Sequence, residues 1–199
     1  MMVSGAHEDV CLAFANTLSW RGRAAPVDAL GDFSDLLDWL AGSTGLAMPA
    51  VQALERRARD HPTTAAEVFS EALALREVVY RAFSALACGD PVSDRDRAAL
   101  NAALADAPAR NRLARAGAGY AWRIEPARIT APALLAPVVW SAGDLIAGGR
   151  LERVRLCANE QCLWLFLDES KAGTRRWCNM ASCGNRAKAR RHYLRTKQA

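Results

Sequence analysis

The sequence predicts a mainly α protein, in which an N-terminal orthogonal helical domain over residues 1–150 precedes a small module over residues 151–199. Apolar residues recur with helical spacing through most of the first segment. Four of the six cysteines, by contrast, lie within the last 43 residues. A chain of 199 residues can bury one good core and carry a small appended unit. We therefore expect two units of unequal size.

Helical segments follow one another along the first unit. Amphipathic periods predict helices over residues 8–20, from Asp32 or Ser34 to Gly42, and over residues 49–59, 65–87, 93–104 and 133–147. Local signals support these limits, with Pro49 in a first turn, Thr63 or Thr64 and Ser93 as N-caps, and Gly89 after a helix end. The helix over 65–87 should be the spine of the domain. Residues 117–130 are expected to form a strand or a loop, because Tyr120, Trp122 and Ile124 occupy alternate positions.

The C-terminal cysteines form two pairs, Cys157-x4-Cys162 and Cys178-x4-Cys183. A structural zinc ion takes four tetrahedral ligands, with Zn–S bonds of about 2.3 Å, and each pair can turn both sulfurs toward one metal. Residues 163–167 are strand-like and residues 174–177 can return as a second strand, so a hairpin separates the pairs and a helix follows them. The sequence thus predicts a small treble-clef-like zinc finger with four cysteine ligands, made of a β-hairpin and a helix and stabilised mainly by Zn²⁺.

Other uses of these cysteines stay open at this point. A redox disulfide pair is one alternative, although clustered cysteines in a reducing compartment are more often metal ligands. An iron–sulfur cluster also takes four thiolates and would colour the protein brown. A structural zinc site that binds no nucleic acid is the third alternative, because many small zinc modules bind proteins. The other two cysteines, Cys11 and Cys88, lie on apolar helical patterns and are expected in the core.

Charge is distributed unevenly along the chain. Nine of the 26 Lys and Arg lie between Ser170 and Ala199, a segment without any Asp or Glu, so the other 17 stand against all 21 acidic residues in residues 1–169. The terminal helix is lightly apolar, which leaves most of its cations free to meet phosphates or bases. A solvated charged tail is the alternative interpretation. The candidate nucleic-acid-binding residues are Arg175, Arg176, Asn185, Arg186, Lys188, Arg190, Arg191 and Arg195.

Polar and aromatic residues also gather in the first unit. A pocket for a small anionic effector is one interpretation, and helix capping with core packing is the other. The residues concerned are Asn16, Thr17, Trp20, Arg21, Arg76 and Tyr80. We find no paired carboxylates at hydrolase spacing, no phosphate-binding glycine loop and no nucleophile with a plausible base, so an enzyme is not expected.

The sequence also bears on location. Asp9 falls where an export signal would be apolar, and the most apolar stretch, residues 131–149, is interrupted by Asp144, prolines and glycines. We therefore expect a cytoplasmic protein that does not cross a membrane.

Two motifs at the C-terminus, Arg175-Arg176-Trp177-Cys178 and Cys183-Gly184-Asn185-Arg186-Ala187-Lys188, resemble the CGNR zinc-finger family. The N-terminal unit resembles the ABATE domain that commonly precedes this finger, in the motifs Phe14-x-Asn16-Thr17, Leu75-Arg76-Glu77-Val78-Val79-Tyr80-Arg81 and Trp140-Ser141-Ala142-Gly143-Asp144-Leu145. The resemblance implies a helical N-terminal domain and a bacterial transcription regulator, with Cys157, Cys162, Cys178 and Cys183 as ligands. It also implies that Arg175, Arg176, Asn185, Arg186 and Lys188 form the surface of the finger.

These observations predict a zinc-containing transcription regulator. DNA is the expected partner of the finger, and the helical domain is expected to sense a ligand or to mediate assembly, for example as a homodimer. The alternative is a regulatory adaptor whose finger binds a protein or RNA.

Overall fold

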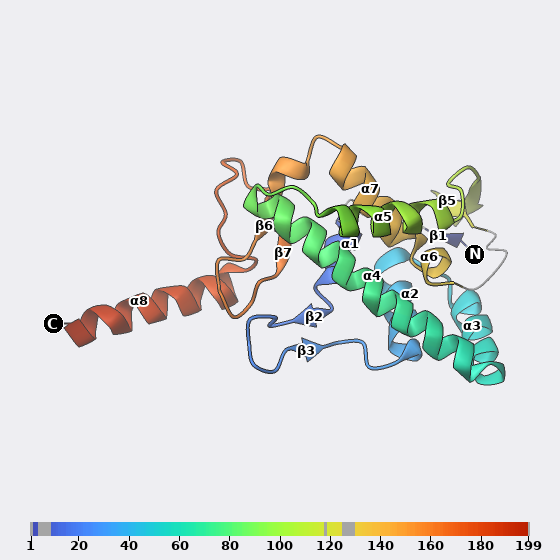
Figure 1. Ribbon diagram of the computed structural model, residues 1–199, viewed down its shortest axis with the longest axis horizontal. Coiled ribbons are helices and arrows are strands. Elements are labelled where there is room, and N and C mark those ends of the chain that lie inside the picture. Colours follow the sequence, from blue (N-terminus) through green and yellow to red (C-terminus); the bar gives the residue numbers. More distant parts are fainter. Residues whose placement is uncertain (1, 4–8, 118, 125–129, 199) are drawn as a thin grey trace.

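The computed structural model describes residues 2–3, 9–117, 119–124 and 130–198. It confirms a mainly α chain whose C-terminal part carries a small hairpin, the clustered cysteines and a helix (Figure 1). The helices are α1 (Val10–Ala15), α2 (Phe33–Thr44), α3 (Met48–Asp60), α4 (Pro62–Cys88), α5 (Asp94–Asp106), α6 (Ala131–Leu134), α7 (Ala136–Ala147) and α8 (Asn185–Gln198), with a 3-10 turn η1 (Leu151–Arg153) and a π-helical turn η2 (Met180–Gly184). The strands are β1 (Met2–Val3), β2 (Leu18–Ser19), β3 (Val27–Asp28), β4 (Leu113–Ala116), β5 (Gly119–Arg123), β6 (Val154–Leu156) and β7 (Leu165–Leu167).

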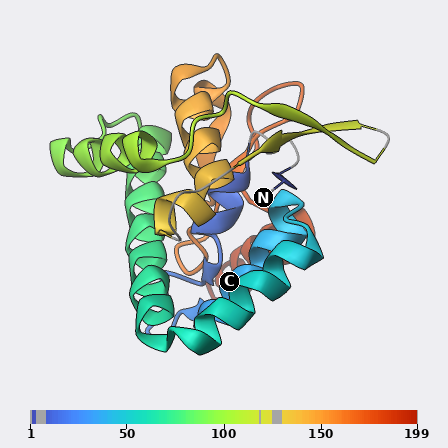
Figure 2. The same cartoon turned by 90° about the vertical axis from the view of Figure 1, so that its right-hand side faces the viewer.

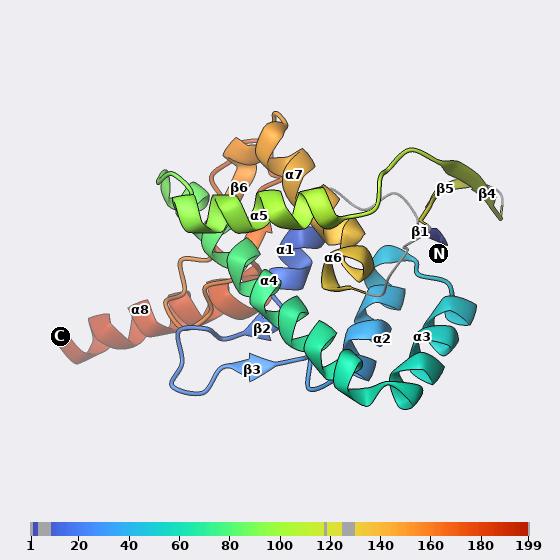
Figure 3. The ribbon, with the colours of Figure 1, turned by 45° about the vertical axis from the view of Figure 1, so that its right-hand side comes forward.

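Several helix limits follow from local signals in the sequence. The Asp32 side chain accepts a hydrogen bond from the Asp35 N–H at the start of α2, and Ser93 accepts one from the Asp96 N–H at the start of α5. Gly89 ends α4 in the left-handed conformation, with φ of 85°. As predicted, α4 is the long central helix, and α1, α2, α3, α5, α6 and the β6–β7 pair pack against it (Figure 3).

Other limits differ from the predictions. The first helix stops at Ala15 instead of Trp20, because the Thr17 hydroxyl bonds the Phe14 carbonyl and the chain then forms the β2 strand. α2 passes Gly42 and ends before Gly45, whose φ is 69°. Thr63 and Thr64 lie inside α4 instead of capping it. The helix expected over 133–147 is divided into α6 and α7.

The strands form three small antiparallel sheets. β1, β5 and β4 make one sheet in which β5 is central, and the β4–β5 ribbon extends from the body (Figure 2). β2 pairs with β3, and β2 lies in the segment that was expected to continue the first helix. β6 pairs with β7 through Val154 with Leu167 and Leu156 with Leu165. The expected return strand over 174–177 is therefore wrong, and the partner of β7 comes from before the first cysteine pair.

One core connects the helical part to the hairpin. Val154, Leu165 and Leu167 are buried in the same cluster as Phe14 and Phe83 from the helices. Phe166 points the other way along the strand and is buried beside the clustered cysteines, as the alternation of a β-strand requires. The hairpin thus joins the helical core on one face to the cysteine cluster on the other.

The remaining cysteines differ in environment. Cys11 is fully buried, as predicted, and burial raises the pKa of its thiol to about 12. Cys88 is exposed at the end of α4, so its assignment to the core was wrong. Within the described residues, no helix is both long and apolar enough to cross a bilayer.

Candidate metal centre and the surface around it

Four sulfur atoms meet at the base of α8. The Sγ atoms of Cys157, Cys162, Cys178 and Cys183 all lie within 4.8 Å of one another. The distances from Cys178 Sγ to the sulfurs of Cys162 and Cys183 are 3.7 and 3.8 Å. Zn–S bonds of about 2.3 Å in a tetrahedron place the sulfurs about 3.8 Å apart. The donor set and its spacing therefore fit one Zn²⁺ ion.

Hydrogen bonds of Asn159 shape the turn between Cys157 and Cys162 and connect it to Cys183. Asn159 turns the chain between Cys157 and Cys162, because its carbonyl accepts from the Cys162 N–H at 2.7 Å and its side-chain oxygen from the Gln161 N–H at 3.1 Å. The same side chain directs its amide N–H to Cys183 Sγ at 3.4 Å. Asn159 thus links the first cysteine turn to the second, as outer-shell groups of metal sites commonly do.

The four thiols affect one another's ionisation. The hydrogen bond from Cys178 lowers the pKa of Cys162 to about 5. The same contact, together with burial, raises the pKa of Cys178, and burial raises that of Cys157. Sulfurs this close cannot all carry a negative charge unless a cation balances them. A bound Zn²⁺ supplies that charge and keeps the four ligands as thiolates.

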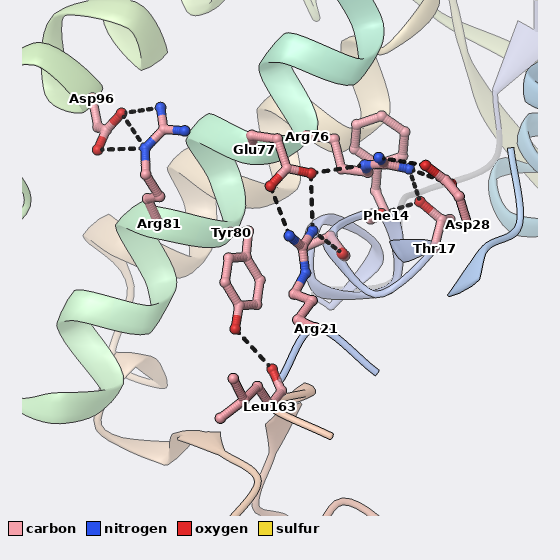
Figure 4. Close-up of polar contacts among 11 residues, drawn as sticks. Phe14, Thr17, Arg21, Asp28, Arg76, Glu77, Tyr80, Arg81, Asp96 and Leu163 are labelled. Atoms are coloured by element: carbon pink, nitrogen blue, oxygen red, sulfur yellow. Dashed lines mark hydrogen bonds and ion pairs between the residues drawn. The ribbon is translucent and has the colours of Figure 1, made fainter. Parts of the chain in front are cut away.

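Four of the six residues of the expected effector pocket, Thr17, Arg21, Arg76 and Tyr80, meet in one polar network with Asp28 and Glu77 (Figure 4). Trp20 instead packs against the clustered cysteines, and the Asn16 side chain bonds the backbone of Leu165. Arg76 is buried and forms two hydrogen bonds to Asp28, at 2.7 and 2.8 Å, and one from its Nε to Glu77 at 3.1 Å. Arg21 pairs with Glu77 at 2.7 Å, and its guanidinium lies 3.7 Å from the centroid of the Tyr80 ring. Two cations here meet two carboxylates, which leaves the network without net charge.

The carboxylates of this network are held ionised. Burial raises the pKa of Asp28, but hydrogen bonding to Arg76 and the charge of Arg76 outweigh burial and lower it. Burial likewise opposes ionisation of Glu77, and its contacts with Arg21 and Arg76 lower its pKa overall. This placement favours a structural role for Arg21 and Arg76.

A cavity of about 420 Å³ lies away from this network, between α2, α3 and α4. It is lined by Phe33, Leu54, Arg57, Ala58, His61, Thr64, Ala65 and Val68.

Four hydrogen bonds, made by Asn16, Tyr80 and Gly22, join the helical part of the chain to the four-cysteine module. The Asn16 side chain donates to the Leu165 carbonyl at 2.8 Å and accepts from the Leu165 N–H at 3.0 Å. The Tyr80 hydroxyl donates to the Leu163 carbonyl at 3.1 Å (Figure 4). The Gly22 N–H donates to the Gln161 carbonyl at 3.3 Å. We call this set of contacts the clasp.

Two protein-family models match this chain. The family model ABATE, described as "Putative stress-induced transcription regulator", matches residues 8–149. The chain belongs to the ABATE family. A second model, the CGNR zinc finger, matches residues 153–196, which include all four clustered cysteines. Both matches confirm the resemblance found in the sequence, and none of the curated proteins compared matches the chain.

Much of the basic surface expected for the CGNR finger is exposed. Arg176, Asn185, Arg186, Lys188 and Arg190 are all exposed. Arg186 and Arg190 also line a groove of about 620 Å³ beside the first cysteine turn, together with Ala158, Asn159, Glu160, Gln161, Trp177 and Ala187. The side chains of Arg191 and Arg195 lie outside the described set.

Arg175 is placed differently from this expectation. Its side chain is half-buried and lies over the Phe166 ring, 4.7 Å from the centroid. Its Nε donates to the Trp177 carbonyl at 2.9 Å, and a terminal nitrogen donates to the Cys178 carbonyl. These hydrogen bonds therefore fix the backbone of Trp177 and Cys178. Arg175 belongs to the scaffold of the CGNR finger, because little of it is left to face a nucleic acid.

The residues singled out from the sequence did not include Asp28, Glu77, Gly22 or Arg23. Glu77 stands inside the Leu75–Arg81 motif of the ABATE resemblance, which is a signal that could have pointed to it. Asp28 lies 48 residues from its partner Arg76, and no local pattern connects the two. Gly22 has no side chain that could mark it in the sequence as a functional residue, so its proximity to the finger is visible only in the folded structure.

Proposed function

We propose that this chain is a zinc-containing transcription regulator that binds DNA through its C-terminal finger. Cys157, Cys162, Cys178 and Cys183 hold the Zn²⁺ in this proposal. The ion, when bound, crosslinks the two cysteine turns, and the chain's own residues make every contact with DNA. We assign the protein a binding role and no catalytic one.

The observation that carries this proposal is the position of α8. The helix packs against η2 at its start and then extends away from the body (Figures 1 and 3). Its 14 residues correspond to a rod about 21 Å long. A helix with its side chains is about 10 to 12 Å across, which matches a B-DNA major groove about 12 Å wide. A projecting rod of this size, fixed at its base by a metal site, suits insertion into that groove.

The charge of the finger suits the same partner. Arg176, Arg186, Lys188, Arg190 and Lys197 are exposed, and the segment after Glu169 contains no acidic residue. Beside Arg186 and Arg190, the groove offers the exposed side chains of Glu160 and Gln161, which can hydrogen-bond base edges. The arginines and lysines would supply affinity through phosphates, and the groove would supply selectivity.

The salt dependence of DNA binding tests this proposal. Five phosphate contacts predict that log K falls with log salt at a slope of about −4.5. Between about 50 and 200 mM salt the affinity should therefore fall by about 500-fold. Arg190→Gln should reduce the slope by about 0.9 without releasing zinc. Arg59→Gln is the matched control, because Arg59 is exposed in the last turn of α3, at the opposite end of the molecule (Figure 1).

Other partners would give different results. Tighter binding to single-stranded RNA than to duplex DNA at every salt concentration would favour the RNA adaptor. Absence of any salt-dependent nucleic-acid binding by the zinc-loaded protein would contradict the proposal and favour a protein partner for the finger.

A further inference from the structure

One indole connects cations from the two parts of the chain. Trp20 is half-buried and packs against the cluster formed by the zinc-site cysteines and Phe166. The guanidinium carbon of Arg23 lies 3.9 Å from the Trp20 ring centroid, and that of Arg186 lies 4.6 Å from it. The two guanidinium carbons are therefore no more than about 8.5 Å apart. Arg23 belongs to the ABATE part of the chain, and Arg186 begins the basic helix of the finger.

The charges of Arg23 and Arg186 are not balanced by any ion pair in the part of the chain that the structure describes. Among the described residues, neither guanidinium forms an ion pair, and both side chains are exposed. The carboxylates of Asp28 and Glu77 are already paired with Arg76 and Arg21. Glu160 lines the same groove as Arg186, but its carboxylate forms no ion pair with Arg23 or Arg186 in the described part of the chain. Like charges at this separation repel each other unless an anion lies between or beside them. The pair is thus a positive centre that a phosphate group would stabilise.

The backbone fixes Arg23 next to the finger. Residues 20–23 form a turn closed by a hydrogen bond of 2.9 Å from the Arg23 N–H to the Trp20 carbonyl. Trp20 has a φ of 56°, a left-handed conformation that a bulky residue keeps only where its surroundings enforce it. Gly22 sits directly against the first cysteine turn, since a Cβ there would lie 1.7 Å from the Glu160 carbonyl oxygen. The turn between β2 and β3 accordingly lies beside the start of α8 (Figures 1 and 3).

We propose that the turn Trp20–Arg23 is part of the DNA interface, where Arg23 and Arg186 together bind phosphate groups of the DNA backbone. Trp20 positions both guanidiniums by stacking and leaves their N–H groups to donate to phosphate oxygens. This inference rests on the proposed DNA binding by the finger. It adds a direct contact from the ABATE domain to the five from the finger, so the footprint on DNA extends beyond the finger and the expected wild-type slope becomes about −5.4.

The test compares salt slopes for the zinc-loaded full chain on short duplex DNA. Arg23→Gln should reduce the slope by about 0.9, as should Arg186→Gln, because each removes one phosphate contact. Arg23→Lys should restore the wild-type slope, since it keeps the charge. Arg59→Gln should leave the slope unchanged. Zinc content and thermal midpoint are measured for every variant, to show that each is folded.

The possible outcomes separate the two proposals. A wild-type slope for Arg23→Gln, combined with a reduced slope for Arg186→Gln, would overturn the role of Arg23 and leave DNA binding by the finger intact. An equal loss of affinity at all salt concentrations in Arg23→Gln would also overturn it, because such a loss reflects packing and not a phosphate contact. If the wild-type chain shows no salt-dependent DNA binding, both proposals fail.

Discussion

The contact between Gly22 and the first cysteine turn provides the sharpest test of how the two parts of the chain are joined. A Cβ added at Gly22 would lie 1.7 Å from the Glu160 carbonyl oxygen, 2.8 Å from the Glu160 carbonyl carbon and 3.0 Å from Gln161 Cα. All three atoms are backbone atoms beside a zinc ligand, so no flexible side chain can give way. In Gly22→Ala the turn and the finger must separate until the shortest distance reaches at least 3.0 Å.

The cost of that separation can be estimated. The Gly22 N–H to Gln161 carbonyl bond is already 3.3 Å long, so a shift of this size breaks it. Overpacking of this kind costs about 1 to 3 kcal/mol. For a chain of this size each kcal/mol corresponds to about 2 to 4 °C in Tm, which gives an expected fall of about 2 to 12 °C. Zinc should remain bound, because none of the four cysteines is altered.

Calorimetry of zinc-saturated protein measures this effect, and Gly42→Ala provides a control of opposite sign. Gly42 lies inside α2 with nothing within 4 Å of its would-be Cβ. Alanine is favoured over glycine in a helix by about 0.8 to 1.0 kcal/mol, so this change should raise Tm by about 2 to 4 °C. A Gly22→Ala protein with a wild-type Tm would refute the close approach of the turn to the finger.

Three further predictions concern the clasp, the polar network and the metal. Tyr80→Phe should lower the free energy of unfolding by about 0.5 to 1.5 kcal/mol with zinc unchanged, because the Leu163 carbonyl loses its donor; an unaltered urea midpoint would contradict this. The pKa values of Asp28 and Glu77 are lowered in the folded state, so their contribution to stability is present above about pH 4 and lost as the pH falls through the folded values. Asp28→Asn should therefore weaken the dependence of the urea midpoint on acid, and an unchanged dependence would argue against the network. Cys178→Ser should lose stoichiometric zinc in elemental analysis, and a full equivalent of zinc would show that the proposed ligand set is wrong.

The parts of the fold that could be predicted from the sequence depend on short-range signals. The caps at Asp32 and Ser93 and the left-handed glycine at Gly89 act within one turn of their helices. The pairing of β7 could not be predicted in the same way. The strand that pairs with β7 is Val154–Leu156, which precedes the first cysteine pair. The predicted hairpin instead pairs residues 163–167 with residues 174–177, which follow them. Both segments are compatible with a strand, and the choice depends on which one buries its apolar face against the helices.

The candidate site shows the same division. The cysteine spacing predicted the cluster correctly because a metal constrains ligands at fixed sequence separation. The role of Arg175 was missed, because a basic motif does not distinguish a guanidinium that donates to carbonyls from one that faces solvent. The early end of α1 was missed for a related reason. The Asn16 side chain satisfies the backbone of Leu165, which is 149 residues away, and no pattern near α1 records that bond.

Zinc and the clasp fix different relationships within the molecule. The metal ties the two cysteine turns to each other and thereby sets the direction of α8 relative to its own finger. It does not tie the finger to the ABATE domain. That second relationship depends on the hairpin core and on the bonds made by Asn16, Gly22 and Tyr80. The contact of Trp20 with Arg186 adds a further link between the two parts of the chain. Asn16 at the end of α1, Tyr80 on α4 and Gly22 in the β2–β3 turn therefore hold the finger against the helical domain at three separate places.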